Sequence, residues 1–190
     1  MNDVVKSAIA LPEACATDAW RKASSDEATQ LAKQRRFIPE DIYPTVQRWS
    51  NFPTADFVCI REVSGVREFM LVRRVEPPFK DEFFVPGGRI PQGVHPKDAC
   101  LIGLKREFKI SPSRVVFTEH YPCFNPETQR DSDPYFTLMH LFAVYLTPDE
   151  EKGIQLDDTG SEKKWFQCIP ADISWQMNEI LALYGFSEDA

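Results

Sequence analysis

The spacing of apolar residues predicts strands in the first half of the chain. Two segments rich in β-branched and aromatic residues, 56–61 (DFVCIR) and 68–74 (EFMLVRR), flank the turn sequence VSGV at 63–66. This order predicts a β-hairpin. A third, short strand at 83–85 is predicted to run directly into the turn Pro86-Gly87-Gly88.

A helix is predicted from Pro96 to about Phe108. Cys100, Leu104 and Phe108 recur at four-residue spacing, which places them on one apolar face. A proline suits the first turn of a helix, and Pro112 prevents this helix from running further. The predicted element is therefore an amphipathic helix that follows the glycine turn.

The second half predicts further strands and a closing helix. Strands are expected at 114–121, 135–146 and 162–168. The closing helix has a largely apolar stripe, which Gly185 could end; the stripe comprises Ile173, Met177, Ile180, Leu181 and Tyr184. The expected fold class is α/β, with a mixed β-sheet and helices packed on it.

The first 37 residues differ from the rest and are rich in Ala, Ser, Lys, Asp and Gln. We expect residues 1–37 to form an extension, in which 18–36 make a polar helix with Thr17 as its N-cap. Residues 38–190 are expected to form the main domain. That domain is predicted to open with a short amphipathic helix carrying Ile42, Val46 and Trp49 at its apolar positions.

Composition narrows the class of protein. A chain of 190 residues, 43% of them hydrophobic, suits one domain with a sizeable core. Its net charge of −7 argues against a general nucleic-acid binder, since a phosphate backbone is met by clustered Lys and Arg. A small anionic ligand can still bind in a local basic pocket.

Cysteine usage and the apolar runs indicate the compartment. The five cysteines are odd in number and contain no C-x-x-C pair, so neither a disulfide framework nor a zinc site is expected. The first residues show no basic segment followed by a long apolar run, and no stretch reaches membrane-spanning length. We expect a cytoplasmic protein without a membrane partner.

The candidate chemistry lies in residues 83–110, FFVPGGRIPQGVHPKDACLIGLKREFKI. A strand, a glycine turn, a loop and a helix follow one another, and such a turn lets backbone groups approach a phosphate or metal. On its own the tripeptide fits equally a tight turn with no ligand. As a whole the segment resembles the Nudix box, G-x5-E-x7-R-E-U-x-E-E-x-G-U. With its first glycine on Gly88, only Glu107 is acidic among the four acidic positions.

The flanking residues resemble one branch of that family, the GDP-mannose mannosyl hydrolases. The features are FFVPGGR after LVRRVEPP, the entry IPEDIY, the Asp56 strand, and LDDTGSEKKWF. The resemblance covers roughly residues 38 to 185. It implies a Nudix-type α/β/α sandwich with a mixed β-sheet.

The resemblance also implies roles for individual residues. Gly87, through its carbonyl, and Glu107 match the family's magnesium ligands, and Arg74 and Arg89 match arginines that contact the diphosphate and the sugar. The family's glutamine and histidine fall on Thr159 and Gly160, which do not match. Asp157 and Asp158 lie just before them and could reach a metal, and Asp158 is the candidate replacement ligand for Mg2+ or Mn2+.

Two further residues are candidates from their own chemistry. His95 lies at the start of the helix, where it could replace the lost catalytic base or serve only as a helix-entry residue. Arg106 and Val94 fall on lost acidic positions and are expected to face the pocket. Two like unit charges about 5 Å apart repel by roughly 3 kcal/mol at an effective ε near 20, so Arg106 opposes a cation. It could bind a phosphate directly instead, or lie with Glu107 on a solvated helix face.

Two functions stay open. The first is a divalent-metal-dependent Nudix hydrolase, with Glu107 and His95 catalytic, acting on a nucleoside diphosphate sugar or a related nucleoside diphosphate derivative. The second is a catalytically silent Nudix module that binds such a ligand and regulates. In both the expected partner is a small nucleotide or nucleotide sugar, not nucleic acid, and a homodimer is left open.

Overall fold

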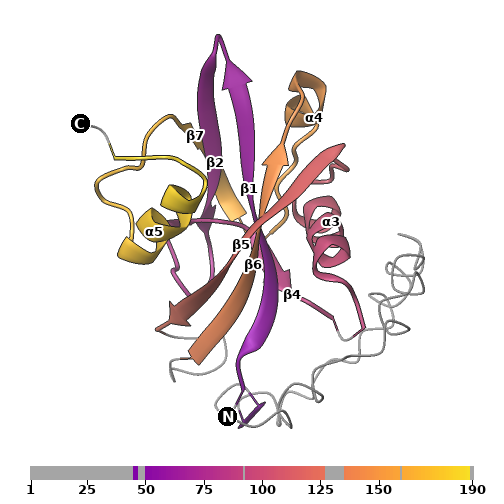
Figure 1. The fold of residues 1–190 in the computed structure, drawn as a ribbon, viewed down its shortest axis with the longest axis vertical. Helices are drawn as coiled ribbons and strands as arrows, with labels where there is room; N and C mark the ends of the chain where they lie inside the picture. Colours follow the sequence, from indigo (N-terminus) through magenta and orange to yellow (C-terminus); the bar gives the residue numbers. More distant parts are fainter. Residues whose placement is uncertain (1–44, 47–49, 92, 127–134, 159, 189–190) are drawn as a thin grey trace, which may run out of the picture.

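A computed structural model describes residues 45–46, 50–91, 93–126, 135–158 and 160–188 of the chain (Figure 1). Its centre is a seven-stranded sheet with the path β3-β2-β1-β6-β5, in which β4 also pairs with β1 and β7 with β2. The strands are β1 (Phe52–Val63), β2 (Val66–Arg74), β3 (Phe83–Phe84), β4 (Gly87–Arg89), β5 (Arg114–Asn125), β6 (Tyr135–Tyr145) and β7 (Gly160–Phe166). The helices are α3 (Pro96–Glu107), α4 (Pro148–Lys152) and α5 (Trp175–Leu183).

The sheet is mixed, as predicted. β1 runs parallel to β6 and antiparallel to β2 and β4. The predicted hairpin joins β1 to β2 through Ser64 and Gly65, whose φ angles are 52° and 81°. Two successive residues with positive φ are typical of the tight turn whose twist matches that of the strands it connects.

Helices α3 and α5 lie on opposite sides of the sheet (Figure 1). On the α3 side, Cys100, Leu104 and Phe108 are buried together with Phe57 of β1. Gly103 lets the helix approach closely, because a Cβ atom there would stand 3.3 Å from the Phe57 ring. The predicted α/β/α sandwich and the apolar face of its central helix are therefore confirmed.

The second core lies beneath α5. Met177, Ile180 and Leu181 are fully buried there against strand residues that include Val58 and Leu141. The helix begins only at Trp175, after Ser174, whose side chain accepts a hydrogen bond from the N–H of Met177. It ends before Gly185, whose φ of 79° continues the chain in the left-handed region.

One short helix, α4, was not predicted from the sequence. Thr147 accepts from the N–H of Glu150, and the Glu150 side chain accepts from the N–H of Thr147. This is a capping box, and the sequence T-P-D-E shows its spacing. No helix among the described residues is long and apolar enough to cross a membrane.

The predictions for the start of the chain fall outside the described residues. These are the extension at 1–37 and most of the short helix predicted around 42–49, of which only 45–46 are described, as helical.

Candidate functional site

Strand β4 consists of the glycine turn and lies against the first half of β1, with Gly87 opposite Asp56. A Cβ atom on Gly87 would stand 2.3 Å from Oδ1 of Asp56 and 2.7 Å from the carbonyl oxygen of Ala55. Since a side chain cannot fit in that space, the close approach of the two strands requires glycine.

The neighbouring hydrogen bonds fix the direction of the backbone groups of Gly87. The N–H of Phe57 donates to the carbonyl of Pro86, and that of Ile90 donates to Pro53, each at 3.0 Å. Hydrogen-bonded and non-hydrogen-bonded pairs alternate along an antiparallel ladder. Gly87 therefore belongs to a non-hydrogen-bonded pair, and its N–H and C=O point away from β1.

Glu107 ends α3, and its side chain is only 7% exposed. Burial raises the pKa of this carboxyl, and the guanidinium of the adjacent Arg106, which forms an ion pair with it, offsets part of that rise. A Cβ atom built on Gly88 would lie 3.1 Å from Nη2 and 3.6 Å from Nη1 of Arg106. The guanidinium of Arg106 thus lies between the Glu107 carboxylate and the glycine turn.

Asp56 is a second buried carboxylate, which the sequence did not single out as a site residue. Burial raises its pKa to about 7; the hydrogen bond from Thr54 lowers it, and the charge of Glu107 raises it further. Thr54 Oγ1 donates to Oδ2 of Asp56 at 2.5 Å. A carboxyl group that titrates near neutrality marks a candidate functional position. An aspartate inside an otherwise apolar strand, TADFVCI, is the sequence signal that could have found it.

The guanidinium of Arg74 interacts electrostatically with the carboxylates of Glu107 and Asp56. Burial lowers the pKa of its guanidinium, and the nearby Tyr135, Glu107 and Asp56 offset part of that effect. The adjacent Arg73 points to the other face of the sheet, as alternate residues of a strand do. The structure therefore brings Arg74, Arg106 and Glu107 of the predicted site together, with Asp56 beside them.

The loop after α4 packs on the end of α3. The N–H of Asp157 donates to the carbonyl of Glu107 at 3.0 Å, and the charge of Asp157 contributes to the raised pKa of Glu107. Asp158, the predicted metal ligand, is exposed. The acidic residue of this loop whose charge reaches Glu107 is thus Asp157.

Arg89 and His95 lie on the two sides of the loop between the glycine turn and α3. The guanidinium of Arg89 stacks on the ring of Phe52, 4.3 Å from its centroid. His95 is the N-cap of α3, where its Nδ1 accepts from the N–H of Lys97 at 3.2 Å. This capping role leaves Nε2 as the nitrogen that is free to face solvent or a ligand.

Val94, which was expected to face the pocket, is a core residue. It is 7% exposed and packs with the α3 cluster. The expectation was wrong because an apolar side chain at the mouth of a helix gains more from burial against the core than from exposure.

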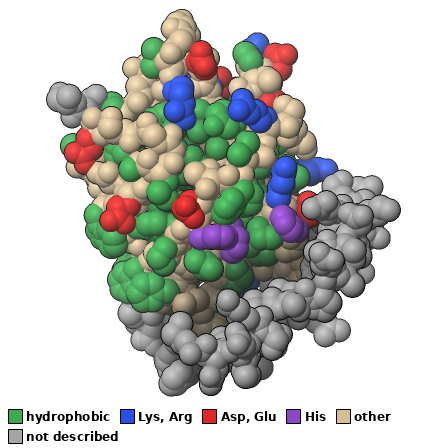
Figure 2. All heavy atoms as spheres, in the orientation of Figure 1, with side chains coloured by type: hydrophobic (Ala, Val, Ile, Leu, Met, Phe, Trp, Pro, Cys, Tyr) green, Lys and Arg blue, Asp and Glu red, His purple; other side chains and the backbone are tan. Residues whose placement is uncertain are grey.

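His140 makes structural contacts in the sheet. Nδ1 of His140 lies 3.1 Å from the carbonyl oxygen of Thr54, and its ring meets that of His120 edge-on at 4.6 Å. Figure 2 shows histidine side chains beside hydrophobic ones on the face it presents. The contacts of the His140 ring are therefore structural.

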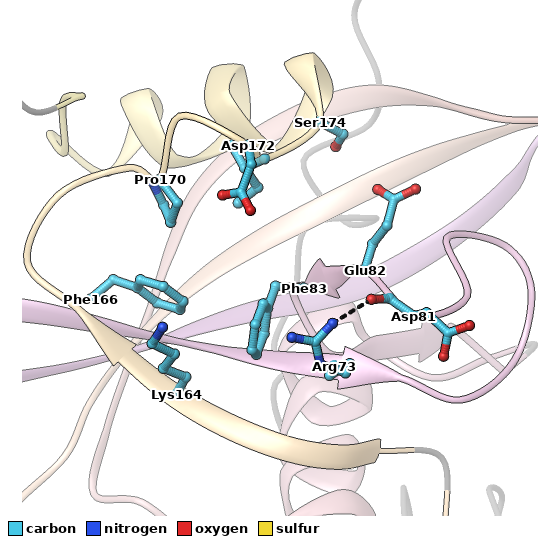
Figure 3. A pocket seen from close by; sticks show the side chains of 10 residues that line it. Arg73, Asp81, Glu82, Phe83, Lys164, Phe166, Pro170, Asp172 and Ser174 are labelled. Carbon is cyan, nitrogen blue, oxygen red and sulfur yellow. Dashed lines mark hydrogen bonds between the residues drawn. The ribbon is translucent and has the colours of Figure 1, made fainter.

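A cleft of about 280 Å³ lies near β7 and the segment that leads into α5 (Figure 3). Phe83 and Phe166 line it with their rings 5.5 Å apart, and Nη1 of Arg73 donates to the carbonyl of Asp81 at 2.6 Å. The described residues that line this cleft include none of the predicted site residues. It is therefore separate from the site at the end of α3.

The strand, glycine turn and helix lie inside a segment that matches a family model. The model of the NUDIX domain matches residues 51–182. The chain belongs to the Nudix family. No curated protein matches this Nudix domain in a sequence search.

Solved structures share the fold. The NUDIX domain of NrtR from Shewanella oneidensis, in complex with ADP ribose, superposes with a TM-score of 0.56 at 14% identity, covering 78% of this chain and 97% of that one. The Ap4A hydrolase of C. elegans gives a TM-score of 0.52 at 21% identity, covering 72% of this chain and 97% of that one. At such identities these Nudix structures establish the fold alone.

Nudix enzymes generally use divalent metals, which would have to be held here by the residues that the structure describes. They contain no group of three or more His, Cys, Asp or Glu side chains placed to hold a metal ion. Magnesium requires near-octahedral oxygen ligation, commonly with one or two free carboxylates. The Glu107 carboxylate is instead engaged by the Arg106 cation. These residues do not fit a preformed Mg2+ or Mn2+ site.

Proposed function

We propose that this Nudix domain is a hydrolase of a nucleoside diphosphate sugar or a related nucleoside diphosphate derivative. The observation that carries the proposal is the position of Glu107, a buried carboxylate beside the glycine turn, with Arg106 and Arg74 around it. Two guanidinium groups next to a turn with outward backbone groups suit a diphosphate, which guanidinium forks bind through two oxygens at once.

The proposed roles follow the resemblance to the GDP-mannose mannosyl hydrolases. Arg74, Arg89 and Arg106 bind the diphosphate and the sugar, and Glu107 and His95 act in catalysis. The alignment on the Nudix box is supported at Lys109, which has a φ of 60°. The box has glycine there, as expected for a position in the left-handed region.

Hydrolysis needs a group that accepts a proton from water. His95 is one candidate, and because the capping hydrogen bond to Nδ1 leaves the proton of the neutral ring on Nε2, it accepts a proton only when Nδ1 releases the N–H of Lys97. The Asp56 carboxyl, with its pKa raised to about 7 by burial, is the second candidate. The ligand is a small molecule and not nucleic acid, because the chain carries a net charge of −7.

The test is a screen of the purified full chain against nucleoside diphosphate sugars and dinucleoside polyphosphates. Released phosphate, sugar and nucleotide are measured in EDTA, in Mg2+ and in Mn2+. On any substrate found, Glu107→Gln should lower kcat by about 100-fold or more, because it removes the charge that holds Arg106. Its melting temperature should change little, because the shape is retained. Full activity in Glu107→Gln would refute this assignment of the site.

The second candidate function is a Nudix module that binds the same ligands and regulates without catalysis. The ion pair between Arg106 and Glu107 favours it, since the carboxylate is already neutralised. A protein that binds a nucleoside diphosphate sugar in calorimetry and turns over none in the screen has this function.

A further inference from the structure

A diphosphate requires positive charge in its pocket, from a metal ion or from side chains. Arg106 is placed to supply it. It lies in the last turn of α3, its side chain is 42% exposed, and it pairs with the buried Glu107 carboxylate. The carboxylate therefore fixes one edge of the guanidinium, and the exposed remainder is open to a ligand.

The same guanidinium also reaches the glycine turn. Its two terminal nitrogens lie 3.1 and 3.6 Å from the position of a Cβ atom on Gly88. A bound oxyanion could thus meet Arg106 and the backbone of the turn at once. Because Gly88 has no side chain, the guanidinium can approach the turn this closely.

Arg106 and a divalent cation would compete for Glu107. Both need its carboxylate as their anchor, and their positive charges repel one another across a short distance. The other acidic positions of the box supply no carboxylate beside Glu107, since Gly103 in α3 and Val94 just before the helix are buried without charge.

We propose that the guanidinium of Arg106 takes the place of the divalent metal ion in this pocket and binds the diphosphate directly, so that nucleotide binding needs no metal. The inference rests on the proposed assignment of the pocket to nucleoside diphosphates. It does not require that the bound compound be hydrolysed.

The experiment is isothermal titration calorimetry of the full chain with ADP, GDP, UDP and inorganic pyrophosphate, each in EDTA and in Mg2+. For the tightest probe, we expect a Kd that changes by less than about threefold between the two buffers. Arg106→Gln should weaken binding in EDTA by about tenfold or more. Arg106→Lys keeps the charge but loses the forked guanidinium, so its Kd in EDTA should lie between those of wild type and Arg106→Gln.

Lys105→Gln is the matched control. It removes one positive charge from the neighbouring position of the same helix turn, and Lys105 is exposed. We expect its Kd to stay within about twofold of wild type. Arg106→Glu should lose binding in EDTA and bind Mn2+ more tightly than wild type, because a second carboxylate then joins Glu107.

Three outcomes would overturn the inference: binding of every probe only when Mg2+ is present, equal losses in Arg106→Gln and Lys105→Gln, or no binding of any probe in either buffer. The proposal that the protein is a hydrolase is tested separately, by turnover of a substrate. Metal-independent binding without turnover of any substrate supports the inference and assigns the protein to the binding class.

Discussion

At the scale of single residues, burial decides the chemistry of this Nudix domain. Asp56 and Glu107 are buried carboxylic acids, and burial raises the pKa of both. Removing a carboxylate from water penalises its charged form, and only a nearby cation or donor offsets that penalty. Arg106 does so for Glu107, and Thr54 does so for Asp56.

The raised pKa of Asp56 predicts a dependence of stability on pH. Burial raises this pKa to about 7, so the folded protein holds the proton more tightly than the unfolded chain. The resulting stabilisation is complete below about pH 4 and is lost as the pH rises through about 7. Asp56→Asn stays neutral, so its stability relative to wild type should rise by on the order of 3 kcal/mol between about pH 4 and 8.

Urea unfolding at both pH values measures this difference. Asp149→Asn is the control, because the Asp149 side chain is 96% exposed. Parallel pH profiles for wild type and both variants would contradict the prediction.

His95 permits a test that separates capping from catalysis. Asparagine is among the best N-cap residues, so His95→Asn should keep the helix start and the melting temperature. If the imidazole is the base, kcat on the substrate found in the screen should fall by about 100-fold or more. His120→Asn changes an exposed histidine elsewhere and should leave kcat unchanged. Equal rates in both variants would leave His95 with a capping role only.

At the scale of elements, α3 joins the core to the site. Its buried face carries Cys100 and Leu104, and its last turn presents Arg106 and Glu107 to the glycine turn. The helix stops at Phe108, and Lys109 then takes a φ of 60°. Any residue other than glycine is strained by about 1 kcal/mol or more in this left-handed region of backbone conformation.

Lys109→Gly should therefore stabilise the protein by about 0.5–1 kcal/mol. The gain is reduced by loss of the bond from Nζ of Lys109 to the carbonyl of Arg106, at 2.5 Å. Lys105→Gly gives the opposite sign, since glycine inside a helix costs about 1 kcal/mol. Chemical denaturation of both variants checks the pair. Destabilisation by Lys109→Gly would mean that the Lys109 side chain matters more than its backbone angle.

At the scale of the whole molecule, one sheet separates two cores. Leu104 lies in the core beneath α3 and Met177 in the core beneath α5, and both are fully buried. β1 contributes to each core, with Phe57 on one face and Val58 on the other. The two cores are therefore expected to unfold together.

Leu104→Ala and Met177→Ala should each cost about 2–5 kcal/mol of stability. In both variants, far-UV circular dichroism and tryptophan fluorescence should report one coincident transition in urea. Two separated transitions in either variant would show that the cores are independent.

The sequence by itself determined the hairpin, the central and closing helices and the identity of their buried faces. The hairpin turn, the stripe on α3 and the closing helix follow from local backbone geometry, which repeats every two residues in a strand and every 3.6 in a helix. The glycine turn that precedes α3 could also be recognised from the sequence. Such signals lie within a few neighbouring residues, so no knowledge of the fold is needed to detect them.

Only the tertiary structure decided how the charged groups meet. Val94 and Arg106 held equivalent positions in the sequence argument, yet one packs in the core and the other lies over Gly88. Asp56 and Glu107 are 51 positions apart in the sequence. Asp56 became a candidate because packing buries it close enough to Glu107 for their charges to interact. A side chain's charge state depends on its burial and its neighbours, and those are set by contacts between distant segments.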